Sequence, residues 1–228
     1  MLSWMSVIGS SFLKPEFWFE KAGSSAIFVV TAIVFAESGL LIGFFLPGDS
    51  LLFFTGFLTS SAANDDKFFH QFAQHVPSLP IVLVCIFLAA VAGDQVGYLF
   101  GRKVGPTLFS RPTSRFFNPQ NVGKAQFFFD KYGAKSIVLA RFVPIVRTFT
   151  PIVAGVGQMR YRTFLTFNVL GGLMWAVGVT SLGHLLGNIE FVRKNIEYAI
   201  VAVIAVSLLP VIVEVVRARR HRRSDATT

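Results

Sequence analysis

The chain has 228 residues, of which 53% are hydrophobic and 14% are charged, and its mean hydropathy is +0.61. A soluble domain carries charge on about a quarter of its residues, so these values exclude an ordinary soluble protein and indicate a single membrane domain. The net charge of +9 does not indicate a nucleic-acid partner, because the basic residues cluster in connecting segments and the tail. Cys85 is the only cysteine, so no disulfide can form within the chain.

The first 62 residues predict an interfacial helix followed by a broken apolar segment. Residues 1–25 mix aromatic and charged side chains, which is typical of a helix lying at the membrane interface. Residues 26–62 are apolar but are interrupted by Glu37 and Asp49. A turn is expected between these two acids at Pro47 and Gly48, because proline ends a helix and glycine permits the turn.

A polar loop is predicted at residues 63–78. His70 and His75 lie in it beside aspartates, which makes a metal site conceivable. The spacing of these residues matches no known ligand pattern, so we expect a solvated loop without a metal.

Residues 79–100 predict the first uninterrupted spanning helix. Glycines recur every four residues from 93 to 105, which places them on one helix face and lets another helix approach closely. Asp94 is an acid inside this span, and Arg102 follows two helical turns later, so that both can face one side.

Basic connections and further spans follow. Residues 101–135 are rich in lysine and arginine and are expected to be cytoplasmic, with a surface helix that Gly133 closes. Spans are predicted at 163–187 and 198–216, and residues 217–228 form a basic cytoplasmic tail.

Between these segments lies the most unusual stretch, residues 141–157. It is apolar except for Arg141 and Arg147, and Pro144 and Pro151 interrupt it. Non-helical backbone at membrane depth is tolerated only where it is buried in protein or lines a water-filled cavity. Charged side chains at that depth usually mark a functional site. The stretch therefore predicts a re-entrant or discontinuous helix with inward-facing charge. The alternative is a tilted span whose arginines reach the headgroups.

The two broken segments match each other. Glu37 corresponds to Arg141, and ten residues later Pro47 corresponds to Pro151. Paired broken segments in two halves are typical of inverted repeats around a midplane transport site, here at about residues 26–100 and 119–187. We expect the acids of the first segment to lie beside the arginines of the second, because buried arginines without partners are costly.

The predicted fold is an all-α integral membrane protein with one membrane domain at 26–216. It would have two inverted re-entrant helical hairpins that meet at the midplane, about three to four transmembrane helices, and interfacial amphipathic helices.

Three motifs in this order resemble the DedA family of membrane proteins, whose eukaryotic relatives are the VTT-domain lipid scramblases. The motifs are FAESGLLIGFFLPGDSLLFFTGFL at 35–58, GDQVGYLFGRKVG at 93–105 and the arginine stretch at 141–157. The resemblance covers about residues 15–216. It implies a multi-pass protein of a bacterial cytoplasmic (inner) membrane that moves undecaprenyl phosphate or a similar polyprenyl phosphate, coupled to protons.

The residue chemistry agrees with that expectation. Arg141 and Arg147 would bind the lipid phosphate, because a guanidinium grips phosphate oxygens in pairs. Glu37 and Asp49 would carry protons, since carboxylates in a low dielectric take them up readily. The expected supporting residues are Asp94, Arg102, Pro47, Gly48, Pro144 and Pro151. The expected partners are membrane lipid and protons. No cofactor, metal or nucleic acid is expected, and whether the chain forms a homo-oligomer stays open.

Three alternatives stay open: a scramblase of broader phospholipid range, an intramembrane lipid phosphatase, and an assembly factor whose charges only pair with one another. A phosphatase would need an activated nucleophile. The sequence has no Gly-x-Ser-x-Gly, no His-Glu-x-x-His and no histidine near the two arginines. Thr148 and Thr150 lack an obvious base, so we expect no enzymatic activity.

Overall fold

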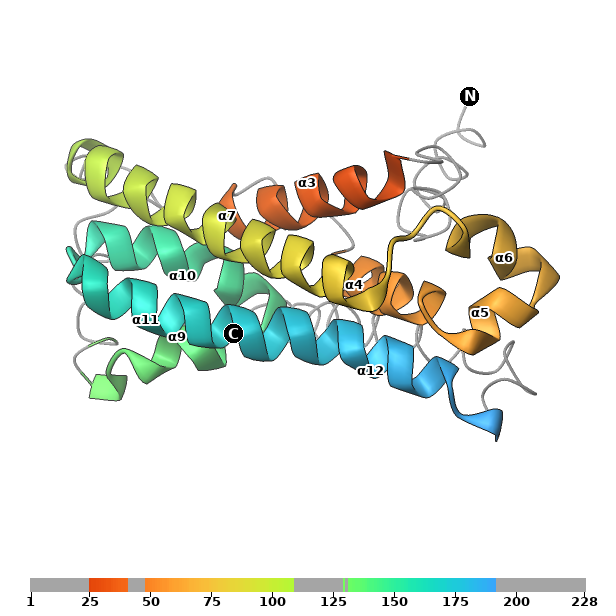
Figure 1. The fold of residues 1–228 in the computed structure, drawn as a ribbon. Helices are drawn as coiled ribbons and strands as arrows, with labels where there is room; N and C mark the ends of the chain where they lie inside the picture. The colour runs from red at the N-terminus through yellow and green to blue at the C-terminus, as the bar shows by residue number, and fades with distance from the viewer. Residues whose placement is uncertain (1–24, 41–47, 109–128, 130, 192–228) are drawn as a thin grey trace, which may run out of the picture.

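Two long helices form the frame of the protein. The computed structural model describes residues 25–40, 48–108, 129 and 131–191, and every regular element within them is helical. One long helix is α7 (Leu79–Leu108), and the other is the continuous run of α11 (Tyr161–Gly172), the π-helical η3 (Leu173–Val177) and α12 (Gly178–Gly187) (Figure 1). The stretches Leu79–Val104 and Tyr161–Gly187 are long and apolar enough to cross a membrane.

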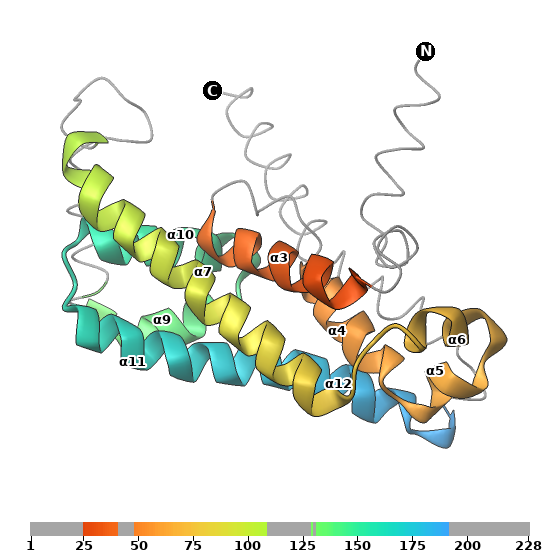
Figure 2. The same cartoon turned by 45° about the horizontal axis from the view of Figure 1, so that its top comes forward.

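Four shorter helices pack on this frame in two pairs. The first pair is α3 (Ala26–Gly39) with α4 (Gly48–Leu58), and the second is α9 (Lys135–Ala140) with α10 (Pro144–Val156). Helices α4 and α10 begin near the middle of the frame and run towards opposite ends (Figures 1 and 2).

The packing partners reveal an approximate two-fold relation. Helix α3 packs on α7 and α9 packs on α11, so the first helix of each pair lies on the long helix of its own half. Helix α4 packs on α12 and α10 packs on α7, so the second helix of each pair lies on the long helix of the other half. The inverted repeats themselves stay a prediction. That the pairs enter the membrane without crossing it stays a prediction.

The glycine repeat in α7 is a packing surface, as predicted. A Cβ atom on Gly93 would lie 2.5 Å from the Phe35 carbonyl oxygen of α3. A Cβ on Gly97 would lie 3.2 Å from the Pro151 Cβ of α10, and a Cβ on Gly101 would collide with the Ile152 carbonyl. The glycines thus let α3 and α10 reach the backbone of α7.

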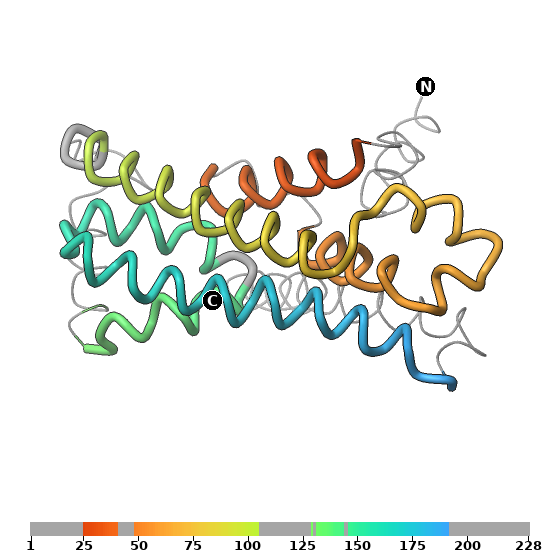
Figure 3. The backbone as a smooth tube through the Cα atoms, viewed as in Figure 1, coloured from red at the N-terminus to blue at the C-terminus, as the bar shows by residue number. Residues whose placement is uncertain are grey.

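The predicted loop at 63–78 is wrong in part, because it contains two short helices, α5 (Ser61–Asp65) and α6 (Lys67–Ala73), shown in orange in Figure 3. The Asp66 carboxylate caps α6 by accepting bonds from the amides of Phe68 and Phe69 at 2.8 and 3.1 Å. Phe69 is buried, and its ring meets that of Phe57 edge to face at 5.3 Å. Phenylalanine burial therefore overrides the polar composition of this stretch.

The second interruption also differs from its predicted place. The helix breaks at residues 141–143, where Val143 is extended (φ −116°, ψ 107°), as a residue before proline must be, and Pro144 starts α10. Pro151 lies inside α10, and the helix continues through it. The prediction of a hairpin within 141–157 is therefore wrong in its bounds: this stretch holds the single helix α10, and the break lies ahead of Pro144, between α9 and α10.

Other boundaries agree more closely. The predicted span at 163–187 coincides with Tyr161–Gly187, whereas α7 continues past residue 100 to Leu108. Gly133 adopts the left-handed conformation (φ 68°) that closes a helix, as predicted. The predictions for 1–25, Pro47, most of the surface helix before Gly133, 198–216 and 217–228 fall outside the described residues.

We expect Gly183→Ala to destabilise the protein, because its new methyl group would collide with the Phe53 carbonyl where α4 crosses α12. Overpacking of this kind costs about 1–3 kcal/mol. The matched control is Gly178→Ala on the same helix, where a Cβ meets nothing within 4 Å. Thermal unfolding in detergent should show a lower midpoint for Gly183→Ala alone. Equal midpoints for the two variants would contradict the close helix crossing.

Candidate functional site

Arg147 of α10 joins the two helix pairs. Its Nη1 donates to Asp49 Oδ1 at 2.6 Å, and its Nη2 donates to Glu37 Oε1. Glu37 lies in the last turn of α3 and Asp49 in the first turn of α4, so one guanidinium binds both helices of the first pair. The Arg147 and Glu37 side chains are buried, whereas that of Asp49 is 39% exposed.

Trp175 completes the surroundings of Arg147. Its indole Nε1 donates to Asp49 Oδ1 at 2.9 Å, and its ring centroid lies 4.5 Å from Arg147 Cζ. A guanidinium over an indole face gains a cation–π attraction that is stronger when water is excluded. Trp175 lies in the π-helical η3, and such bulges often occur at functional sites.

Arg141 occupies the break between α9 and α10 and is paired differently. Its Nη2 donates to the Asp94 carboxylate and, at 2.5 Å, to Asn168 Oδ1. Asn168 Nδ2 in turn donates to the Val91 carbonyl at 3.2 Å. Gly171 leaves room for this arginine, because a Cβ there would lie 2.9 Å from Arg141 Cδ.

These two groups form one site, the central charge cluster of Glu37, Asp49, Asp94, Arg141 and Arg147. The Asp94 carboxylate interacts electrostatically with both arginines, so the two sets of ion pairs are neighbours. With every group ionised, three carboxylates face two guanidiniums and the formal charge is −1. One bound proton would make the cluster neutral.

Some polar atoms of the cluster have spare capacity. The Nε atoms of Arg141 and Arg147 are buried, and they donate no hydrogen bond within the described part of the chain. Glu37 Oε2 occupies the space that a Cβ on Gly48 would fill, so a larger residue at the start of α4 would displace this carboxylate. The buried donors could serve an anion that enters the cluster.

The remaining predicted residues lie elsewhere or have structural places. Arg102 is exposed and does not join Asp94 in the cluster; instead it lines a cavity near the far end of α7. Pro144 starts α10, Pro151 packs on Gly97, and Pro47 is outside the described residues.

Sequence reasoning missed Asn168 and the role of Trp175. A buried asparagine in an otherwise apolar span is a signal that could have identified Asn168, since buried amides need partners. Nothing in the sequence pattern indicates the π-helical turn around Trp175.

The structure gives no metal-binding arrangement within its described ranges, where no group of three His, Cys, Asp or Glu side chains is found. His184 Nδ1 lies 2.9 Å from Thr59 Oγ1, and its Nε2 contacts Asn188. Thr150 Oγ1 donates to the Val146 carbonyl of its own helix at 2.6 Å. These contacts are structural, and they supply no activated nucleophile.

We expect Asp94→Asn to destabilise the fold by about 3–5 kcal/mol, because it leaves the buried Arg141 guanidinium without a counter-charge. The double variant Asp94→Asn/Arg141→Gln removes both charges and should lose less stability than Asp94→Asn alone. Denaturant unfolding in detergent measures both. A double variant that is as unstable as the single one would show that charge pairing is not the cause.

Comparison with known proteins gives consistent matches. The family model of the VTT domain matches residues 46–185. The chain is 43% identical over 198 residues to protein DedA of Escherichia coli K12, covering 87% of this chain and 84% of that protein. It is 43% identical over 215 residues to an uncharacterised membrane protein of Mycobacterium tuberculosis, covering 93% and 89% of the two chains.

A more distant relative is the inner membrane protein YghB of Escherichia coli K12. It is 34% identical over 172 residues, which cover 75% of this chain and 73% of that protein. No solved structure matches the chain.

Proposed function

The chain belongs to the DedA family of VTT-domain membrane proteins, and on that premise we propose that it transports an anionic polyprenyl phosphate, such as undecaprenyl phosphate, coupled to protons. The membrane location is supported by two long apolar helices and by relatives named as membrane proteins. The proposed membrane is the cytoplasmic membrane of a bacterium, with the basic tail inside.

The observation that carries the proposal is the buried Arg147 between Glu37 and Asp49, where the two helix pairs meet. Burying a charge is costly unless it is paired, so the two carboxylates keep the guanidinium stable in this position. A phosphate also presents anionic oxygen acceptors, and two of them can accept from one guanidinium fork in place of these carboxylates. The site is therefore suited to an anionic headgroup that is exchanged.

Proton coupling follows from the charges of the cluster. A phosphate that takes Arg147 from Glu37 leaves this buried carboxylate without its cation, and an isolated buried charge is strongly unfavourable. Glu37 can avoid that cost by binding a proton. Ligand binding and proton uptake are thereby linked at one side chain, without any further residue.

The symmetry of the fold supports transport rather than simple binding. Helices α4 and α10 start near the middle of the frame and lead to opposite ends (Figure 2). We propose that the two helix pairs are re-entrant hairpins that enter from opposite membrane faces, so that the cluster can open to either side. The break at 141–143 and the π-helical η3 are the points where the backbone can adjust.

Conservative replacements of the arginines test the role of the guanidinium fork. Arg141→Lys and Arg147→Lys keep the charge but lose the paired donors, and a lost charged hydrogen bond costs about 1.5–3 kcal/mol. We therefore expect each variant to translocate polyprenyl phosphate in proteoliposomes about tenfold slower or worse. Arg219→Lys in the tail is the control. Wild-type rates in both cluster variants would refute phosphate gripping.

Glu37→Gln tests proton coupling. Arg147 keeps Asp49 in this variant, so the fold should persist, but the introduced amide side chain binds no proton. We expect the transport rate to lose its dependence on pH, whereas Asp225→Asn in the tail retains the wild-type profile. An unchanged pH profile in Glu37→Gln would exclude this residue as the coupling group.

The same proteoliposomes separate the alternative functions. Translocation of many phospholipids with equal rates would indicate a scramblase, and release of inorganic phosphate would indicate a phosphatase. Neither activity, with a stable fold, would indicate an assembly factor.

A further inference from the structure

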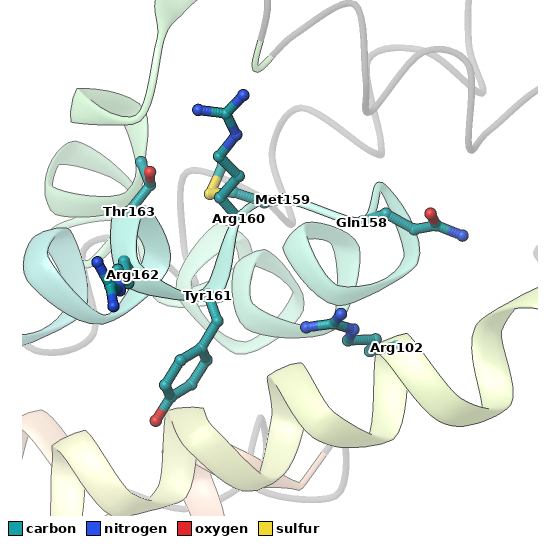
Figure 4. Close-up of a pocket in the computed structure, with 7 residues that line it drawn as sticks. All are labelled: Arg102, Gln158, Met159, Arg160, Tyr161, Arg162 and Thr163. Carbon is teal, nitrogen blue, oxygen red and sulfur yellow. The ribbon is translucent and has the colours of Figure 1, made fainter.

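A second group of arginines surrounds a cavity near the end of α7, away from the central charge cluster. The cavity has a volume of about 620 Å³ (Figure 4). Its lining residues come from α7 and from the turn that leads from α10 into α11: Arg102, Gln158, Met159, Arg160, Tyr161, Arg162 and Thr163.

The three arginines of this arginine cavity carry charge that no acid in the described part of the chain pairs with. Arg102, Arg160 and Arg162 are exposed, no acid lines the cavity, and none of the three forms an ion pair with another described residue. Figure 4 shows Arg102 reaching from α7 towards the segment that bears the other two. The contrast with Arg141 and Arg147, which are both paired, indicates a different role.

The backbone of the cavity is held in one shape. The buried Tyr98 hydroxyl donates to the Met159 carbonyl at 2.5 Å, and the Tyr98 ring stacks on Phe164 at 4.4 Å. Gln158 adopts a left-handed conformation (φ 50°), which is uncommon for a residue other than glycine and must be held by its surroundings. Helix α11 starts beside the cavity with no acid in its first turn.

The position of the cavity relates it to the membrane surface. The apolar stretch of α7 ends at Val104, and that of the second long helix begins at Tyr161. Arg102 and Arg160 therefore lie where both apolar stretches end, at the expected depth of lipid headgroups.

We propose that the arginine cavity is a second anion site, which binds a phosphomonoester group presented at the membrane surface. A phosphomonoester carries up to two negative charges and can accept paired hydrogen bonds from two or three guanidiniums. Each arginine side chain has enough rotatable bonds to turn towards a phosphate in the cavity. The binding chemistry stands on the cavity alone; its use as the first stop of a transported lipid rests on the proposed function.

The test is a titration of the full chain in detergent with three probes: phosphatidic acid, phosphatidylglycerol and inorganic phosphate. Native mass spectrometry measures how much of each probe is bound. The titration uses the wild-type chain, and the single variants described next assign the binding to the arginine cavity or to the central charge cluster. We expect phosphatidic acid, a phosphomonoester, to bind more tightly than phosphatidylglycerol, a diester.

Single variants then assign the site. Arg102→Gln, Arg160→Gln and Arg162→Gln should each weaken phosphatidic acid binding about tenfold, the loss of one charged hydrogen bond. Lys103→Gln removes the same charge from an exposed neighbour of Arg102 that does not line the cavity, and it should change binding less than about twofold. An equal effect of Lys103→Gln, or equal binding of the two lipids, would overturn the proposal.

Two further readouts separate the sources of the phosphate and the two sites. Tighter binding of phosphatidic acid than of inorganic phosphate supports a lipid ligand, and the reverse supports a soluble phosphate at the same arginines. In transport assays, Arg160→Gln should raise the apparent KM with little change in maximal rate. If lipid transport is absent in the wild type but the titration succeeds, only the proposed function fails.

Discussion

The pairing of Arg147 with Glu37 and Asp49 is the interaction on which the arrangement of the two halves depends. It is the point where α3, α4 and α10 meet, and Trp175 brings the second long helix to the same place. A buried guanidinium without counter-charges would destabilise the fold by several kcal/mol, so this contact holds the two helix pairs together. A ligand that displaced these carboxylates, as the proposed function requires, would act on the contacts that hold the halves together.

The glycine contacts show where such movement can occur. Backbone meets backbone where α3 and α10 cross α7, and again where α4 crosses α12 at Gly56 and Gly183. The helices cannot slide past one another at these crossings, because closely packed protein interiors have low compressibility. They define two tight units, α3–α7–α10 and α4–α12. The polar cluster lies across the boundary between the units, and ionic contacts can exchange partners without opening a void.

Much of the site could be predicted from the sequence because charges in an apolar stretch are costly and need partners. That argument identified Glu37, Asp49 and Arg147 together. It did not identify the partner of Arg141: matched repeats suggested Glu37, whereas Asp94 of the long helix takes that place. The position of the second break was missed because the sequence allows a helix break at either Pro144 or Pro151. In the structure, Pro151 lies within α10 and packs on Gly97, and the break is ahead of Pro144.

The arginines of the cavity and those of the central charge cluster differ in how strongly they can attract a phosphate. Exposed arginines that form no ion pair within the described residues attract a phosphate across water, but salt and solvent screen that attraction and keep it weak and reversible. The buried cluster interacts strongly, yet its formal charge is already −1 with every group ionised, so a phosphate that arrives without protons is repelled overall. Protonation of its carboxylates removes that repulsion and leaves two guanidiniums to face the phosphate. If the proposed function holds, the surface site would select the headgroup, and proton supply, rather than arginine affinity, would determine whether the headgroup enters.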